Sequence, residues 1–254
     1  MAAVFCKPQG ITYETSSALT VAEPKNMTND EPGMVWRSSG LSGAYVVFKT
    51  ENKPVDTIAI IGNNLQSSGT IRVRMGTTVT EVNDNAAFDQ TFSAWSGIAP
   101  IDDATSVFLL DAPVTYQFIR LDFADPTNPD GYFECCRLLL GTRVTNVGID
   151  IGHEVELDDT SNILDEYGSL TIDSYRVRTK HKITVSGVKD ADYYANWEPF
   201  MLSTGMSKFF LFIEKDDDEF AQRKTLYVRN SANPKRTDNG SNNNTLEFQV
   251  TTYK

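Results

Sequence analysis

Histidine and cysteine, which build many catalytic and metal sites, are scarce in this sequence. The 254 residues include two histidines, His153 and His181, and three cysteines. A catalytic histidine needs a nucleophile or a carboxylate beside it, and no GxSxG or HExxH motif supplies one. His181 falls on the mainly apolar face of a predicted strand, which favours a core position. Because the cysteines also lack a partner at zinc-ligand spacing, we expect no enzymatic activity, no metal site and no cofactor.

The three cysteines bear on where the chain folds. Cys135 and Cys136 are adjacent, so in a strand they point to opposite faces, which is poor geometry for a mutual bridge. A disulfide from Cys6 to one of them remains open. Buried, reduced thiols are the favoured interpretation, and they indicate folding in a reducing cytoplasm.

Positive charge is also in deficit. The chain has 23 Lys and Arg against 34 Asp and Glu, a formal net charge of −11 and a sequence pI near 4.7. A protein that tracks nucleic-acid phosphates presents a basic surface, so nucleic-acid binding is not expected. No apolar run approaches the roughly 18 residues of a membrane span, and the first residues do not resemble a signal peptide. We therefore expect neither membrane insertion nor secretion.

Helical periodicity is rare, and β alternation takes its place. Residues 70–75 (TIRVRM) alternate polar and apolar side chains, as a half-buried antiparallel strand does. Eight or so short strands precede residue 142, and the polar segment 77–85 is expected to be a loop or an edge strand. The pattern predicts a mainly β protein: an antiparallel jelly-roll sandwich over residues 1–142, then a β-rich domain over residues 143–254.

One short helix is expected in the second domain, near residues 190–204. Asp190 can cap its start, Trp197 and Phe200 lie on one face at helical spacing, and Gly205 can end it. Pro199 lies inside this segment and lacks a backbone donor. A kink or a break is therefore predicted there.

The predicted strand that holds His181 carries a row of cations on its other face. These four residues are Arg176, Arg178, Lys180 and Lys182. Like charges on one face repel, so solvent, an acidic neighbouring strand, an acidic loop or another subunit must compensate them. The acidic run Asp216, Asp217, Asp218 and Glu219 is one such loop, and a solvated hairpin tip is favoured for it over a cation site. We treat both sets as a candidate subunit interface, since head-to-tail contacts of opposite charge can close a ring.

Several aromatic residues of the first domain are candidates for stacking on a sugar. Trp36, Trp95 and Tyr132 are the candidate glycan-facing residues, with Tyr13, Tyr45 and Phe88 as further aromatics of the same region. Core packing is the alternative interpretation for all of them.

Two segments of the first domain carry a family resemblance. Residues 32–43 (PGMVWRSSGLSG) and 55–65 (VDTIAIIGNNL), with residues 118–122, 128–134 and 137–141 further on, resemble a discoidin-type jelly roll (coagulation factor 5/8 type C-like) of the kind found in bacteriophage tail proteins. The second half is similar to such proteins in its hairpin, its helix ending at Ser203-Thr204-Gly205, and the strand 209–213. Departures from the family pattern are the Cys135-Cys136 pair and Pro199.

The resemblance implies a structural role in the virion. It implies a distal tail or baseplate protein that forms a homo-oligomeric ring and connects tail and hub proteins after assembly in the host bacterial cytoplasm. Related carbohydrate-binding modules imply an alternative, a host-adhesion module that binds cell-surface glycan through loops of the jelly roll. In those modules a calcium ion is often held near the N-terminal turn, where Asn29 and Asp30 stand in this sequence.

Overall fold

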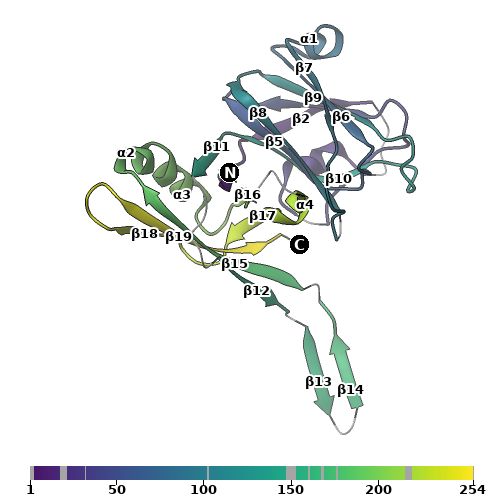
Figure 1. The fold of residues 1–254 in the computed structure, drawn as a ribbon. Helices are drawn as coiled ribbons and strands as arrows, with labels where there is room; N and C mark the ends of the chain where they lie inside the picture. Colours follow the sequence, from purple (N-terminus) through teal and green to yellow (C-terminus); the bar gives the residue numbers. More distant parts are fainter. Residues whose placement is uncertain are drawn as a thin grey trace. The chain divides into compact units, whose positions relative to one another are not determined.

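The structure is a computed structural model that describes residues 3–17, 22–31, 33–101, 103–146, 153–159, 161–166, 169–175, 177–214 and 219–253. The chain is mainly β, as predicted (Figure 1). It divides into two compact units. We call Phe5–Arg143 with Lys215–Thr225 the sandwich unit, and Met1–Val4, Val144–Glu214 and Leu226–Lys254 the arm unit.

Two antiparallel sheets form the sandwich unit. Within the described residues, one sheet has the order β3 (Trp36–Arg37), β10 (Glu134–Gly141), β5 (Val55–Asn63) and β8 (Ala104–Val114). The other has the order β2 (Ile11–Ser16), β4 (Tyr45–Thr50), β9 (Phe118–Ala124), β6 (Thr70–Gly76) and β7 (Phe88–Ser93). The chain passes from one sheet to the other between β4 and β5, β5 and β6, β7 and β8, β8 and β9, and β9 and β10. This alternation is the jelly-roll arrangement that the sequence predicted.

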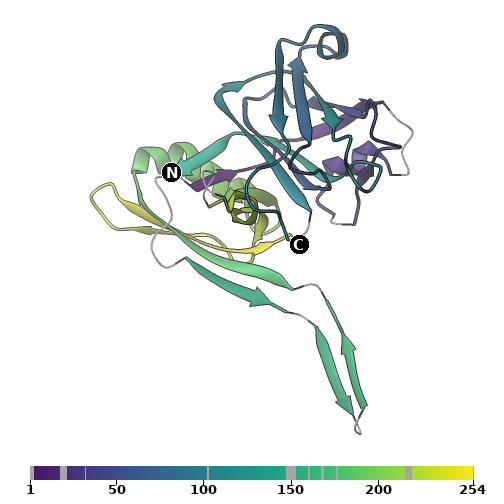
Figure 2. The same cartoon turned by 45° about the vertical axis from the view of Figure 1, so that its right-hand side comes forward.

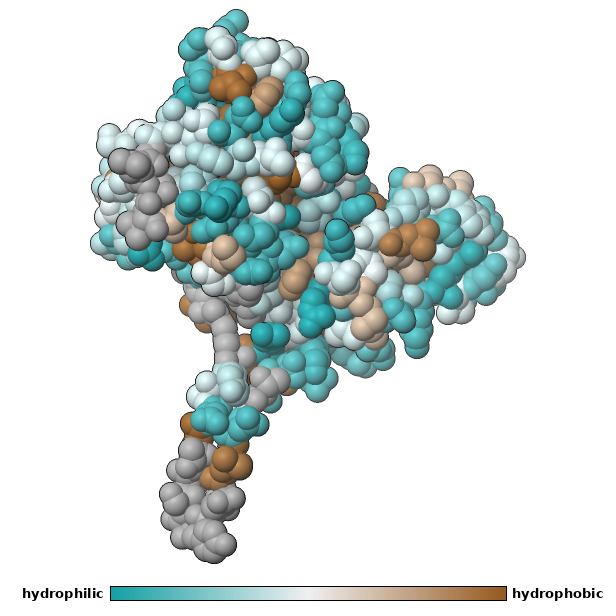
Figure 3. Space-filling view, turned by 180° about the vertical axis from the view of Figure 1, so that it is seen from behind, coloured by the Kyte–Doolittle hydropathy of each residue, from teal (hydrophilic) through white to brown (hydrophobic). Residues whose placement is uncertain are grey.

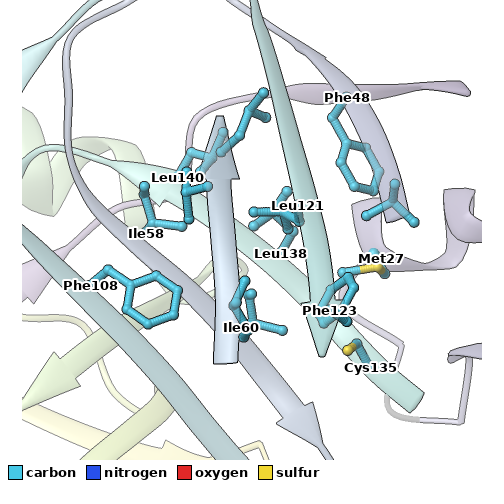
Figure 4. Packing of buried hydrophobic residues seen from close by; sticks show 14 of the residues in the cluster. Met27, Phe48, Ile58, Ile60, Phe108, Leu121, Phe123, Cys135, Leu138 and Leu140 are labelled. Atoms are coloured by element: carbon cyan, nitrogen blue, oxygen red, sulfur yellow. The ribbon is translucent and has the colours of Figure 1, made fainter. Parts of the chain in front are cut away.

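The core of the sandwich lies between the two sheets. Ile58 and Ile60 of β5 and Leu138 of β10 are fully buried, and Leu121 and Phe123 of β9 pack against them from the other sheet (Figure 4). All nine residues of β5 are buried. That agrees with its continuous apolar sequence, because a strand covered on both faces has no polar side to alternate with.

The sequence prediction missed a short helix whose start is capped by polar side chains. Residues 77–85, expected as a loop or an edge strand, contain α1 (Val79–Asp84). The Thr78 hydroxyl accepts a hydrogen bond from the Glu81 backbone N–H at 3.1 Å, and the Glu81 carboxylate accepts one from the Thr77 N–H at 2.6 Å. This is a helix-starting pattern in which Thr and Glu stand three residues apart, so the signal was present in the sequence. A short 3₁₀ helix, η1 (Pro24–Thr28), lies in the loop before β3.

The arm unit is built on one large sheet. Within the described residues it has eight strands, seven of them in the order β11 (Arg143–Asn146), β1 (Ala3–Cys6), β16 (Phe209–Ile213), β17 (Thr225–Asn230), β19 (Asn244–Thr252), β15 (Arg178–Val188) and β12 (Glu154–Asp158), with β18 (Lys235–Asp238) beside β19. Beyond β12 and β15 the chain forms a two-stranded hairpin, β13 (Asn162–Glu166) and β14 (Ser169–Asp173). Figures 1 and 2 both show this hairpin extending past the rest of the sheet.

The predicted helix is confirmed, with the irregularity expected at Pro199. It starts as α2 (Asp190–Asp192), passes through one π-helical stretch, η2 (Tyr193–Trp197), and continues as α3 (Glu198–Thr204). Pro199 stands at the start of α3, where a missing N–H is least costly, and the π-helical stretch lies just before it. Gly205 ends the helix at φ +48°, but Asp190 does not cap its start: its carboxylate accepts a hydrogen bond from the Asn244 amide at 2.8 Å instead.

The helix covers the apolar face of the large sheet with aromatic side chains. Trp197 lies 6.0 Å from Phe248 of β19, and Phe200 lies 5.2 Å from Phe210 of β16, between ring centroids. The indole N–H of Trp197 donates to Asp192 at 3.0 Å, so the buried ring keeps a polar partner.

One segment of the second half belongs to the sandwich unit. Lys215–Thr225, which contains α4 (Ala221–Lys224), groups with the sandwich, and Gln222 of this segment lies against β8, an end strand of its sheet. The Gln222 side chain accepts from the Thr105 N–H at 3.1 Å and donates to the Thr105 carbonyl at 3.0 Å, as a neighbouring strand would. Gly97, at φ +84°, gives the backbone of Glu219 room to approach, and the Ile98 N–H donates to the Glu219 carbonyl at 2.7 Å.

The three cysteines are free and buried. Burial raises the pKa of the Cys6 thiol above its ordinary value, and burial followed by the charge of Cys136 raises the pKa of Cys135. Both thiols are therefore held in the protonated, unreactive form.

We predict that Gln222→Ala destabilises the sandwich unit by about 1–3 kcal/mol, because two hydrogen bonds are lost and the Thr105 backbone is left without its partner. Denaturant unfolding followed by tryptophan fluorescence measures the change. Arg223→Ala, next to it and exposed, is the matched control and should cost less than about 0.5 kcal/mol. Equal effects of the two substitutions would show that the side-chain bridge does not hold the segment.

Candidate functional site

The first candidate site is a loop of the sandwich unit, Asn64, Leu65 and Gln66, which follows β5 directly. We call it the Asn64 loop. The Asn64 amide donates to the Asp130 carboxylate at 2.8 Å and to the Tyr132 carbonyl at 3.0 Å. Its oxygen accepts from the Glu134 N–H at 2.9 Å. One side chain thus ties the loop after β5 to the segment that leads into β10.

The turn-rich segment 125–131 completes the Asn64 loop from the other side. The Asn128 amide donates to the Asn64 carbonyl at 3.0 Å, and the Asp125 carboxylate, which is fully buried, accepts from the Gln66 N–H at 2.8 Å. Asx side chains that bond to backbone groups replace the hydrogen bonds that an irregular loop cannot make for itself. The loop is therefore held in one conformation.

Two of the three predicted glycan-facing aromatics meet at this loop. The indole N–H of Trp95 donates to the Leu65 carbonyl at 2.7 Å. The guanidinium of Arg37 lies 4.3 Å from the centroid of the Tyr132 ring and donates from Nε to the Glu134 carboxylate at 2.8 Å. Both rings are half-buried. Aromatic surface thus lies beside charged and amide groups at this loop, although Trp95 also packs against the hydrophobic core.

The prediction for Trp36 was wrong. Its ring is fully buried, 5.0 Å from Phe123 between centroids, because β3 places it on the inner face of the sandwich. Period-two alternation could not decide this, since β3 has only two residues. Core packing, the alternative interpretation, applies to Trp36.

The suggested calcium position has an internal cation instead. Arg137 donates from Nη1 to the Met27 carbonyl at 3.3 Å, and its Nε lies 3.0 Å from the Asp30 carboxylate. The Asn29 side chain accepts from the Glu31 N–H at 2.9 Å. No cluster of three or more His, Cys, Asp or Glu suited to a metal ion occurs in the part of the chain that the structure describes. The guanidinium thus supplies the positive charge among these loop oxygens.

The second candidate site is the basic row of β15. The structure pairs it with an acidic row on β12: Glu154 lies opposite Lys182, Glu156 opposite Lys180, and Asp158 opposite Arg178. The Lys180 ammonium lies 2.8 Å from Asp158, which raises the pKa of Lys180, and the Lys182 ammonium lies 3.5 Å from Glu154. An acidic neighbouring strand, one of the alternatives open from sequence, therefore compensates these charges. The rows stay solvent-accessible, so their role as a subunit interface remains a prediction.

The other members of that predicted interface are not tested by the structure. Arg176, Asp216, Asp217 and Asp218 lie outside the described residues. Glu219 is exposed, and it belongs to the sandwich unit, whereas the basic row belongs to the arm unit.

The hairpin beyond these rows exposes an apolar surface that sequence analysis did not single out. We call β12, β13, residues 169–175 and residues 177–182 the hairpin arm. Its exposed apolar residues, each between 45% and 72% exposed, are Val155, Leu157, Ile163, Leu164, Ile172, Tyr175 and Val177. Figure 3 shows brown, hydrophobic side chains on this projection. Val155 lies opposite His181 and Leu157 opposite Thr179. They therefore lie on the same face of the sheet as Ile183, which is buried in the core, but at Val155 and Leu157 this face is exposed to solvent.

The base of the hairpin arm also holds a surface hollow of about 390 Å³. Its lining residues are Glu154, Val155, Glu156, Lys180, His181, Lys182, Ser231 and Gln249. His181 is buried, as predicted for a core histidine. Among the described residues, no helix combines the length and the apolar character needed to cross a bilayer.

We predict that Asn64→Ala destabilises the sandwich unit by about 2–4 kcal/mol, because three hydrogen bonds of this side chain are lost together. Thermal and denaturant unfolding measure the change. Ser67→Ala, an exposed position in the following turn, is the control and should lie within about 0.5 kcal/mol of the wild type. A loss below 1 kcal/mol for Asn64→Ala would contradict the view that this amide organises the loop.

Solved structures similar to this chain include carbohydrate-binding modules. A CBM32 module of a family 31 glycoside hydrolase from Clostridium perfringens is 11% identical, covers 54% of this chain and 96% of its own, and has a TM-score of 0.39. The family 32 module of C. perfringens NanJ, in complex with galactose, is 14% identical over 54% and 98%, with a TM-score of 0.38. The CBM32 of AlyQ, in complex with 4,5-unsaturated mannuronic acid, is 16% identical over 54% and 96%, with a TM-score of 0.35. No protein-family model matches the chain, and no curated protein matches it.

Proposed function

We propose that this chain is a non-enzymatic structural component of a bacteriophage virion, a distal tail or baseplate protein whose copies form a ring and connect tail and hub proteins. The resemblance of residues 32–43 and 55–65 to phage tail jelly rolls supports the virion. The exposed apolar surface of the hairpin arm supports assembly, and it is the observation that carries this proposal.

Contact with a partner would stabilise the hairpin arm. A two-stranded hairpin is at best marginally stable alone in water, and β13 and β14 pair with each other to form a separate two-stranded sheet. Each leucine or isoleucine that moves from full exposure to full burial contributes about 1.5–3 kcal/mol. Complete burial of Leu157, Ile163 and Ile172, which are 54–72% exposed, would contribute about 3–6 kcal/mol for each copy, so a stable contact needs the other apolar residues of the arm as well.

The face of the arm, and not its edge, is the contact we propose. β12 ends the sheet order, so its outer backbone edge is open, but Glu154, Glu156 and Asp158 place three carboxylates along that strand. Charged side chains are a common way to keep an edge strand from pairing with another chain. The acidic and basic rows lie on the opposite face of these strands from Val155 and Leu157 and pair with each other within one copy, so they leave the apolar face as the contact surface. The occupant we propose for that apolar face is the same face of a second copy of this chain.

We predict that Leu157→Asp combined with Ile163→Asp abolishes self-assembly, because two carboxylates then replace the apolar contact. Native mass spectrometry and analytical ultracentrifugation at micromolar concentration measure the oligomer, and electron microscopy of virions locates it.

The matched control is Leu202→Asp, an equally exposed leucine (79%) on α3, outside the arm. It should leave the oligomer intact. A wild-type chain that stays monomeric and is absent from virions would overturn the assembly proposal. An oligomer unaffected by the paired arm substitutions would place the contact elsewhere.

A second function, binding of a cell-surface glycan, is favoured by the Asn64 loop. Tyr132 is partly exposed with the Arg37 guanidinium over its ring, Arg37 is bonded to Glu134, and Asp130 is bonded to Asn64 of the loop. An aromatic platform beside convergent polar groups is the usual composition of a sugar site. In this view the sandwich unit adheres to the host.

We predict that Tyr132→Ala lowers glycan affinity at least tenfold in an array of bacterial polysaccharides, because the stacking surface is removed. Tyr175→Ala, an exposed tyrosine of the hairpin arm, should leave binding unchanged. Absence of any signal for the wild-type chain would remove this second function.

A further inference from the structure

The two histidines, 28 positions apart in sequence, contact each other at the base of the hairpin arm. His153 Nε2 lies 3.1 Å from His181 Nδ1, the ring centroids are 5.2 Å apart, and the rings are inclined by 25°. Two imidazole nitrogens at this distance share one hydrogen. Both side chains are largely shielded from solvent. The ring of Phe212 of β16 lies edge to face with the His153 ring, 6.4 Å away between centroids.

The neighbours of the pair assign its protons. His153 Nδ1 faces the Glu214 carboxylate at 3.8 Å, which is longer than a hydrogen bond, and the negative charge there favours a hydrogen on Nδ1, so Nε2 accepts. His181 therefore donates from Nδ1, and its Nε2 accepts from the Thr179 hydroxyl at 3.0 Å. In this arrangement the 3.1 Å contact holds one hydrogen, and both ring nitrogens of His181 have a hydrogen-bond partner.

Added protons affect this arrangement unequally. A first proton fits, because the Thr179 hydroxyl can rotate and accept from His181 Nε2. A second proton places a hydrogen on both nitrogens of the 3.1 Å contact, and two facing N–H groups repel. The rings must then separate.

Burial makes the second proton unfavourable. Desolvation, followed by the charge of His153, lowers the pKa of His181 from 6.5 to about 4. The charged groups around the pair in the described residues are Glu214 after β16, Glu154 and Glu156 of β12, and Lys180 and Lys182 of β15; the side of β19 that meets β15 here contributes Val250 and Gln249. The carboxylates and ammonium groups of β12 and β15 lie on the opposite sheet face and largely compensate each other.

The histidine pair lies at the start of the ladder between β12 and β15. His153 directly precedes β12, and Val155, two residues later, is the register partner of His181. β12 is an end strand and has β15 as its partner, so the histidine contact adds a side-chain clamp to the start of that ladder.

We propose that His153 and His181 form a proton-operated clamp that holds β12 on β15 at neutral pH and releases the base of the hairpin arm in mildly acidic surroundings. Its meaning for assembly rests on the proposed function, but the clamp itself does not. The sign follows from the protons bound: an open His181 titrates near 6.5 and a closed one near 4, so opening is favoured as the pH falls from about 6.5 towards 4.

Amide hydrogen exchange of the full-length chain, corrected for the intrinsic pH dependence of exchange, tests the clamp. Between pH 7.5 and 5.0 we expect the opening constant of β12 to rise about 30-fold, the factor that the two pKa values give. β6 and β9 of the sandwich unit serve as the reference in the same sample and should change little. Unchanged protection of β12 would overturn the clamp.

A double variant and a wild-type titration exclude other causes. His153→Gln with His181→Gln keeps amide donors and acceptors without a titratable ring, so β12 should show the same protection at both pH values. If the double variant responds like the wild type, the β12 carboxylates and not the histidines sense pH, and the clamp is wrong. In NMR titration of the wild type, His181 should titrate near 4; a value of 6 or above would also overturn it.

These readouts are separate from assembly. They are made at concentrations where the chain is monomeric, so a chain that never forms a ring can still show the clamp. Conversely, a ring that is equally stable at pH 7.5 and 5.0 while β12 opens would show that the clamp does not control assembly.

Discussion

The sandwich unit depends on one constraint: β5 is buried along its whole length. A strand without an exposed face has no polar side chains to spare, so its neighbours must cover both of its faces. β10 and β8 pair with its two edges, and its Ile58 and Ile60 share one core cluster with Leu121 and Phe123 of the opposite sheet. The loop that follows β5 is fixed in position as a result. Its backbone is satisfied by Asn64, Asn128 and Asp125, so the candidate binding loop is an extension of the buried strand.

Electrostatics in the arm unit depends on strand register. The basic row of β15 needs compensation, and β12 supplies it residue for residue because their side chains alternate with the same period. The same register brings Val155 and Leu157 to the opposite face, where the core ends and solvent begins. One pairing thus produces both the charged rows and the exposed apolar surface of the hairpin arm.

The sequence predicted what depends on local pattern. The mainly β class, the helix near 190–204, its end at Gly205 and its irregularity at Pro199 follow from periodicity and backbone chemistry. α1 was missed, although the spacing of Thr78 and Glu81 indicates a helix start. Trp36 could not be placed, because two residues of strand show no alternation. The cross-strand partner of Lys180 and the contact of His153 with His181 depend on which strands become neighbours, and that is decided by the whole core.

The bridge from Gln222 to Thr105 has a consequence for synthesis. β8 emerges from the ribosome more than a hundred residues before the segment that covers its edge. Until then the sandwich has every residue of its core but retains one unpaired strand edge, open to wrong partners. The nascent chain must therefore pass through a state in which the core of the sandwich is packed but the edge of β8 is uncovered. The segment around Gln222, which covers this edge, is translated as part of the second half of the chain.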